Sequence, residues 1–315
     1  MTLKDTDLHV HLLQSLYPED ILNLAKDQYR NIDWNRFGFL ERYQSIIGEA
    51  LDPPAMIEKA LKTGSLKEIE EVMVYRGEEG GDFDIFNIKS FFPLCVTGFY
   101  LDKDRHEVVT QPIIDRHKQE GIAYIEYRQG VGYADAVKEA WKDWHKQFIQ
   151  FLKDVSTDSF QAKYIMRITP EAYPAVREFI TENPDLMDIL VGLDFSGRES
   201  PPKYYQKFFE KFHKDNLENP GKALDMVIHI GEDYFDKSIE SAIRWCHETV
   251  ELGVKRIGHA IALGLDPEIA TKRRPQAHTK ERVSERLDQI NYDLNHMQLL
   301  SEYNIKINRE KLLKE

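Results

Sequence analysis

Two histidines separated by a single valine, His9 and His11, lie near the start of the chain in the segment DTDLHVHLLQS. In a strand, residues two positions apart point to the same face, so both imidazoles would project together while the apolar neighbours pack on the other side. Two imidazoles on one strand can bind one metal ion. Two exposed histidines on a polar strand face would give the same pattern, so other residues have to distinguish these interpretations.

Further polar residues follow apolar, β-branched stretches, at positions where buried strands would end: His229 and Glu232 in HIGED (229–233), His259 in RIGHAIA (256–262), and Asp194 and Gly197 in GLDFSGRE (192–199). In a (β/α)8 barrel the catalytic residues lie at the C-terminal ends of different strands. His9 and His11 would end the first strand. All of these side chains could therefore meet at one rim.

Imidazoles and a carboxylate at one rim favour zinc, which binds nitrogen and oxygen ligands and keeps an open position for water in catalytic sites. Zinc lowers the pKa of that water to about 7. Glu232, three residues beyond His229, could exchange protons with a substrate beside the metal. Taken singly, each histidine could be a core or loop residue, and Gly231 and Gly258 could be ordinary turn glycines. Taken together, these residues predict a metal site.

The composition favours a folded domain and argues against several classes of protein. The chain has 315 residues, 42% of them hydrophobic, and a formal net charge of −12. An acidic surface repels phosphate backbones, which argues against nucleic acid as the main partner. No apolar run reaches the roughly 18 residues of a membrane span, and no signal-peptide pattern opens the chain. Two cysteines, Cys95 and Cys246, are too few for a disulfide framework, so we expect a cytoplasmic protein.

Short apolar stretches alternate with helical patterns, which predicts a parallel sheet with crossover helices. The expected strands are DLHVH (7–11), IAYIEYR (122–128), KYIMRI (163–168), DILVGLDFSG (188–197), DMVIHIGE (225–232) and VKRIGHAIA (254–262). The expected helices are Tyr133–Lys153, two segments opened by Pro170 and by Pro201–Pro202, and Ser238–Leu252 ended by Gly253. Residues 19–120 form a long, mostly helical excursion that would cap one end of a barrel, as a functional lid or as a packing subdomain.

The motifs DLHVHL, YIEYR, GLDFSGRE, HIGED and RIGHA, in this order, resemble those of the adenosine deaminase family of the amidohydrolase superfamily. The resemblance covers residues 6–262 and implies an α/β fold, a (β/α)8 TIM-type barrel of the amidohydrolase type that holds one Zn²⁺. The resemblance implies that His9, His11 and His229 are zinc ligands. Glu232 would be the proton shuttle, and His259 would orient the hydroxide. Gly197 and Asp194 would bind the substrate, with Gly197 forming a hydrogen bond to the purine ring.

The reaction implied by this resemblance is the hydrolytic deamination of an adenine nucleoside or nucleotide, of the adenosine-to-inosine type. Hydroxide adds to C6 of the purine while protonated Glu232 gives its proton to N1, and ammonia leaves. A glutamate with an ordinary pKa of about 4.3 is ionised at pH 7. The pocket must therefore favour the protonated form, or Glu232 must take its proton from the zinc-bound water. The implied partner is a small-molecule purine nucleoside or nucleotide, and a homo-oligomer is left open.

Two departures from the family pattern affect this prediction. Leu13 and Gln14 stand where the family has an Asp-Gly pair whose aspartate contacts ribose, so the substrate could be another adenine nucleoside, a nucleotide or a different aminated ring. No Ser/Thr-Asp-Asp segment follows His259 to supply the aspartate that completes the family's zinc shell. Residues 263–315 are instead charged and mostly helical in pattern, and NIKIN (304–308) is the candidate for a seventh strand where eight are expected.

Three explanations of the missing strands are open. We expect the native chain to continue past Glu315; alternatively, another chain supplies the missing part, or the barrel has a modified rim. A long charged segment after RIGHA is also similar to the large adenosine-deaminase-like subunits of bacterial antiphage systems. The basic cluster Lys272, Arg273 and Arg274 would be an exposed loop in an acidic protein, or a site for nucleotide phosphates or a partner.

Two other functions compete with a zinc aminohydrolase. Another metal-dependent hydrolase on the same barrel would often use two metals and a bridging lysine, but no lysine stands at a matching strand end and Arg128 occupies the YIEYR position. A catalytically incomplete binding or assembly subunit with a relict site would explain the missing aspartate. In each case we expect residues 1–262 to form the barrel, and residues 263–315 to be a charged insertion or an incomplete C-terminal part.

Overall fold

A computed structural model describes residues 5–76, 83–130, 140–197, 199–233, 237–266, 268–269 and 282–315. The basic cluster Lys272, Arg273 and Arg274 lies outside the described residues, as do the first residues of the predicted helix Tyr133–Lys153. No helix in the described part of the chain combines the length and the apolar character needed to cross a lipid bilayer.

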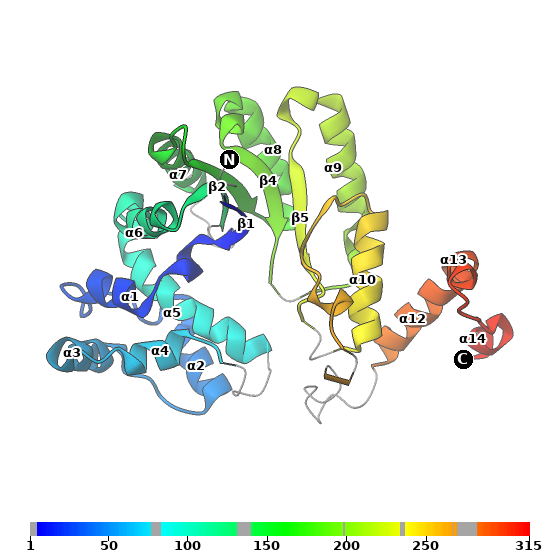
Figure 1. Cartoon of the computed structure of the whole chain (residues 1–315), viewed down its shortest axis with the longest axis horizontal. Helices are drawn as coiled ribbons and strands as arrows, with labels where there is room; N and C mark the ends of the chain where they lie inside the picture. Colours follow the sequence, from blue (N-terminus) through cyan, green and yellow to red (C-terminus); the bar gives the residue numbers. More distant parts are fainter. Residues whose placement is uncertain are drawn as a thin grey trace.

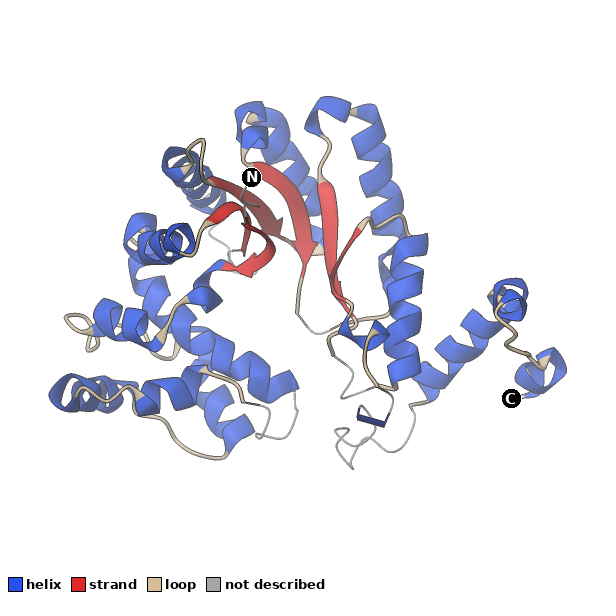
Figure 2. Ribbon diagram, viewed as in Figure 1, coloured by secondary structure: helices blue, strands red, loops and turns tan. Residues whose placement is uncertain are grey.

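Six parallel strands form a single sheet in which every strand pairs with the next one along the chain. The strands are β1 (Asp5–His11), β2 (Ile122–Gln129), β3 (Gln161–Arg167), β4 (Leu190–Phe195), β5 (Asp225–Ile230) and β6 (Arg256–His259). The sheet curves until it is nearly closed into a barrel, consistent with a TIM-like barrel (Figures 1 and 2). All six predicted strands are confirmed, although the ends differ by a few residues.

The helices that connect the later strands lie outside the sheet (Figure 2). They are α7 (Ala140–Val155), α8 (Tyr173–Glu182), α9 (Gln206–Glu218) and α10 (Ile239–Glu251), with short 3₁₀ segments η4 (Pro170–Ala172), η5 (Pro184–Asp188), η6 (Pro202–Tyr205) and η7 (Pro220–Lys222). The start of α10 is capped by Ser238, whose hydroxyl accepts a hydrogen bond from the Ser241 amide at 3.1 Å. Gly253, with φ of +83°, ends this helix region as predicted.

The predicted excursion between β1 and β2 is helical. It contains η1 (Leu12–Ser15), α1 (Pro18–Ala25), η2 (Arg36–Gly38), α2 (Phe39–Ile47), α3 (Pro53–Thr63), α4 (Lys67–Met73), α5 (Phe83–Leu101) and α6 (His106–Gln119). Its apolar residues and those of the sheet belong to one continuous core, in which Phe39, Phe92 and Ile125 are fully buried. The excursion is therefore packed against the barrel rather than separate from it.

The C-terminal part leads away from the barrel (Figure 1). It contains η8 (Ile261–Leu263), α12 (Val283–Asn295), α13 (Met297–Glu302) and α14 (Arg309–Lys314). The helical pattern predicted beyond residue 263 is confirmed for residues 282–315, whereas the seventh strand suggested for NIKIN is wrong. Residues 305–308 connect α13 to α14 without pairing to the sheet. This segment is exposed, so its isoleucines have no strand neighbours to pack against.

A buried histidine gives the fold an expected dependence on pH. His145 on α7 is fully buried, and its Nδ1 lies 3.0 Å from the hydroxyl of Tyr164, which donates to the carbonyl oxygen of Gln129 at 2.6 Å. Burial lowers the pKa of His145 to about 3, and His106 adds to the effect. Unfolding returns the pKa to about 6.5, so the unfolded state binds more protons and stability is lost as the pH falls below that value.

We expect this contribution to disappear in His145→Phe. Between pH 8 and pH 6 the native chain should lose about 0.8 kcal/mol of unfolding free energy relative to the variant, because its unfolded state takes up a proton that its folded state excludes. Urea unfolding followed by circular dichroism at the two pH values measures this difference. Identical pH dependence in the two proteins would contradict the assignment.

Candidate metal centre

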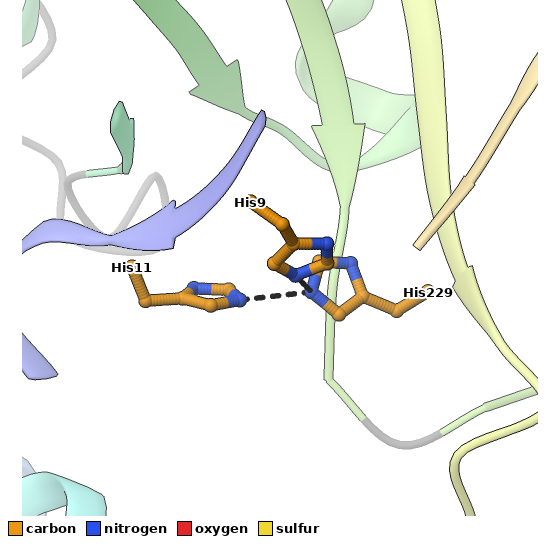
Figure 3. A group of neighbouring side chains, drawn as sticks. All are labelled: His9, His11 and His229. Atoms are coloured by element: carbon orange, nitrogen blue, oxygen red, sulfur yellow. Dashed lines mark hydrogen bonds between the residues drawn. The ribbon is translucent and has the colours of Figure 1, made fainter. Parts of the chain in front are cut away.

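Three imidazoles from two distant parts of the chain meet at the carboxyl ends of the strands. His9 and His11 end β1 and His229 lies in β5 (Figure 3). The Nε2 atom of His229 lies 3.1 Å from Nε2 of His9 and 2.9 Å from Nε2 of His11. Ligand nitrogens around a tetrahedral zinc ion, each about 2.0 Å from the metal, lie about 3.3 Å apart. The two distances to His229 are close to that spacing, and one ligand atom of each of the three residues lies within 4.8 Å of the other two, so the group could hold one metal ion.

The protonation of these rings also suits metal binding. Nδ1 of His229 lies 3.0 Å from the carbonyl oxygen of Phe195 and 3.0 Å from Oδ1 of Asp194. A proton on Nδ1 is donated to the Phe195 carbonyl oxygen, close to the Asp194 carboxylate, and leaves the lone pair of Nε2 facing His9 and His11. Burial, followed by the charge of Arg128, lowers the pKa of His9 to about 2. That ring is neutral at pH 7 and its nitrogen can act as a ligand.

A histidine and a glutamate complete the group. Nε2 of His259, at the end of β6, lies 3.1 Å from Oε2 of Glu232, in the loop after β5. One nitrogen of His229 lies within 4.8 Å of a ligand atom of each of these two residues, so they adjoin the three imidazoles. His9, His11, His229, Glu232 and His259 are called the strand-end cluster below. Within the cluster, both groups of three that share His229 could hold a metal ion.

The surroundings of Glu232 raise the pKa of its carboxyl group, so that it can carry a proton near neutral pH. Burial raises its pKa to about 7, and the carboxylates of Glu199 and Asp233 oppose the lowering effect of His229. At neutral pH a substantial fraction of this carboxyl group is protonated, whereas an ordinary glutamate would be ionised. Burial also lowers the pKa of His259 to about 4, so its ring is neutral. The surroundings therefore shift Glu232 towards its protonated form at neutral pH.

The backbone at the strand ends adopts conformations that place these side chains. Gly231 has φ of +79°, and a Cβ there would lie 2.7 Å from Sγ of Cys246 and 3.1 Å from Cα of Ala260. Only glycine fits this turn between His229 and Glu232. His259 and Ala260 have φ of 76° and 52°. Positive φ in residues other than glycine is uncommon and concentrates at functional sites.

Gly258 is required for a different reason, which is close packing. A Cβ on Gly258 would lie 2.8 Å from Cε1 of His9 and 3.3 Å from the carbonyl oxygen of Ile228.

We expect Gly258→Ala to displace the His9 ring and to weaken metal binding about 10- to 100-fold, the size of effect seen when an outer-shell partner is changed. Isothermal titration with Zn²⁺ measures it. Gly221→Ala is the control, because a Cβ there meets nothing within 4 Å; equal affinities in the two variants would contradict the prediction.

A buried carboxylate that the sequence did not single out holds the loop of Glu232. One oxygen of Glu199 accepts hydrogen bonds from the amides of Glu232 and Asp233, both at 2.8 Å. Its other oxygen lies 3.9 Å from Nζ of Lys237, which is also buried. Glu199 stands in the GLDFSGRE motif, but only the packing of the β4 and β5 loops shows its role. It positions Glu232 through the backbone.

A cavity of about 410 Å³ opens beside the cluster, within the size range of small-molecule sites. The strand ends and α7 contribute some of its lining residues: His11, Leu13, Gln14, Arg128, Gln129, Gly130, Trp141, Trp144 and Arg167. The excursion contributes the others: Arg36, Phe37, Leu94, Thr97, Gly98, Leu101, Asp102 and Asp104. The segment predicted as a cap therefore forms a wall of the cavity next to the candidate metal ligands.

The two residues predicted to bind substrate lie at different distances from this cavity. Asp194 is fully buried behind His229, where its carboxylate contacts the ring rather than open space. Gly197 lies in the loop after β4 with φ of +120°, and a Cβ there would lie 3.6 Å from Nη2 of Arg167, a cavity residue. The five residues of the strand-end cluster are thus brought together, while Asp194 stands behind them and Gly197 near the cavity rim.

Comparison with models of known protein families gives no match to the chain. Comparison with curated proteins gives no match either. The chemistry of the strand-end cluster and the cavity beside it is therefore the basis for assigning a function.

Proposed function

We propose that the protein is a zinc-dependent aminohydrolase that deaminates an adenine nucleoside or nucleotide. The observation that carries the proposal is the convergence of three imidazoles, His9, His11 and His229, beside a carboxyl group whose pKa is raised to about 7. Three imidazoles are a known catalytic zinc set, which leaves a coordination position open. The order of motifs along the chain, similar to that of the adenosine deaminase family, supports the same reaction.

The residues present fit a zinc ion, because three imidazoles offer nitrogen ligand atoms that all lie within 4.8 Å of one another. Zinc bound there would supply an acidified water molecule at neutral pH. Glu232 can hold a proton on Oε2 and deliver it to a ring nitrogen of the base, which makes the attacked carbon more electrophilic. Nε2 of His259, 3.1 Å from Oε2, fixes the orientation of that carboxyl group.

The residues that line the cavity are of the types that could bind a flat, polar substrate. Trp141 and Trp144 are aromatic residues of the cavity wall that a purine could contact. Arg128 is buried, and its Nε and Nη1 have no hydrogen-bond partner among the described residues. Leu13 and Gln14 both line the cavity, so the residues that replace the expected Asp-Gly pair are in place to contact the part of the substrate beyond the base.

The test is a metal analysis combined with an assay of ammonia release. Purified full-length protein is expected to contain zinc bound by the strand-end cluster and to release ammonia from at least one of adenosine, deoxyadenosine, AMP and ATP. Treatment with a chelator should abolish the activity, and added Zn²⁺ should restore it. A protein with zinc in this cluster that converts none of these compounds would contradict the proposal and would favour a binding or assembly subunit.

A second candidate is a different metal-dependent hydrolase that uses two ions. It is favoured by one observation, namely that His9, His11 and His229 adjoin the group His229, Glu232 and His259. The contacts of His229 oppose it, because Nδ1 is occupied by Phe195 and Asp194 and only Nε2 is left for a metal. Two ions in the strand-end cluster of the active protein would favour this candidate.

A further inference from the structure

A second group of metal-binding side chains lies outside the barrel, between α10 and the end of α12. His247 and Glu251 are one turn apart on α10, and His296 directly follows α12. Nε2 of His296 lies 2.9 Å and 3.0 Å from the two carboxylate oxygens of Glu251. Nδ1 of His247 lies 3.8 Å from Oε2 of the same carboxylate. One ligand atom from each residue lies within 4.8 Å of the other two. These three residues are called the α10–α12 cluster below.

The rings are oriented by Tyr292, one turn before His296 on α12. Nδ1 of His296 lies 2.8 Å from the carbonyl oxygen of Tyr292, to which it can only donate. This contact keeps the Nδ1 proton in place and directs Nε2 towards Glu251. Histidines that bind metals commonly donate their other nitrogen to a backbone carbonyl in this way. The Tyr292 hydroxyl lies 3.0 Å from Nδ1 of His247, so metal binding by His247 requires this hydroxyl to move aside.

Two imidazoles and one carboxylate form a zinc ligand set known from catalytic sites, in which water takes the remaining position. A pair of ligands at positions i and i+4 of a helix lies on one face and can reach one ion. Glu251 and His247 are partly exposed to solvent, so an ion can enter and keep a water ligand. We propose that the α10–α12 cluster binds one divalent transition-metal ion, with Zn²⁺ as the best match, and that the ion fastens α12 to α10.

Few buried residues hold α12 in place, so a metal ion that joins it to α10 would add to its attachment. Its first half is held by two buried carboxylates: Glu285 accepts from the amide of Ser238 at 2.8 Å, and Asp288 accepts from the indole of Trp245 at 3.0 Å. The buried residues of α12 are these two and Ile290, so little apolar area holds its second half. A metal ion at His296 would attach the end of α12, where no residue of the helix beyond Ile290 is buried.

The test is the number of metal ions that the full chain binds. Protein freed of metal with a chelator is titrated with Zn²⁺ by calorimetry and with Co²⁺ by absorption spectroscopy, in His229→Ala to remove the strand-end site. One equivalent should remain in this variant. Adding Glu251→Gln or His296→Ala should weaken its binding at least tenfold. In the otherwise native chain, each of these two changes should remove one equivalent and leave the other unchanged.

Glu240→Gln is the matched control, because Glu240 is an exposed glutamate in the first turn of the same helix. Hydrogen exchange of residues 283–302 should slow when Zn²⁺ is added to His229→Ala, but not when Glu251→Gln is also present. If Glu251→Gln and His296→Ala bind as much Zn²⁺ as the Glu240→Gln control, with the same affinity, the cluster is an ordinary histidine–glutamate ion pair and the proposal is wrong. The measurement does not depend on whether the protein deaminates adenine compounds.

Discussion

Replacing Glu232 with glutamine is expected to lower the turnover of the preferred substrate about 1,000-fold or more while the zinc content stays unchanged. A general acid or base contributes about 10²- to 10⁴-fold to the rate of a reaction. Glutamine has nearly the same shape and can keep a contact with Nε2 of His259, but it has no proton to deliver to the base. Steady-state kinetics together with metal analysis of the same preparation measure both quantities.

Two further results would decide whether the proton is the cause. Glu240→Gln makes the same chemical change at an exposed position on α10 and should leave turnover unaffected. Thermal unfolding of Glu232→Gln should occur near the temperature of the native chain, since no buried charge pair is broken. Turnover in Glu232→Gln within a few-fold of the native rate would exclude Glu232 as the shuttle.

His229→Ala is expected to remove one equivalent of zinc and, with it, all measurable deamination. His229 supplies the nitrogen on which the distances to His9 and His11 converge. The loss of affinity should exceed the roughly 10- to 100-fold that follows from changing an outer-shell partner, because a ligand itself is lost. Equilibrium dialysis with Zn²⁺ measures the affinity, and the ion bound by the α10–α12 cluster should remain.

His213→Ala serves as the control for this variant. It removes an imidazole from α9 whose Nε2 contacts the carbonyl oxygen of Leu252 at 2.7 Å, away from the strand-end cluster. Zinc binding in the control should equal that of the native chain. If His229→Ala retains its full complement of zinc with native affinity, the three imidazoles do not form the metal centre.

The strands and the main site residues could be predicted because their signals are local. A buried parallel strand is a short apolar run, and each of the six runs has a polar residue at or near its C-terminal end, the end that lies at one rim of the fold. His9 and His11 are two positions apart, so the strand geometry alone points both to one side. The failed prediction, a strand at residues 304–308, rested on two isoleucines in a segment that has no partner to pair with.

Other features depend on tertiary contacts that no local pattern reveals. Glu199 binds two amides more than thirty positions further along the chain. Gly258 is close to the His9 ring because the curvature of the sheet brings its first and last strands towards each other, although the two strands do not pair. The excursion was predicted to cover one end of the barrel, but the residues with which it lines the cavity, such as Phe37 and Leu101, carry no recognisable motif. These contacts come from packing between distant elements.

The separation of His9 and His259 along the chain has a consequence for how the protein is made. The two rings lie with their centres 4.4 Å apart, although they are contributed by the first and last strands of the sheet. At synthesis rates of about 5–20 residues per second, the ribosome adds the second roughly 12–50 s after the first. For most of that interval, until His229 is added, the nascent chain carries His9 and His11 without the third imidazole, so the centre is among the last parts of the barrel to mature.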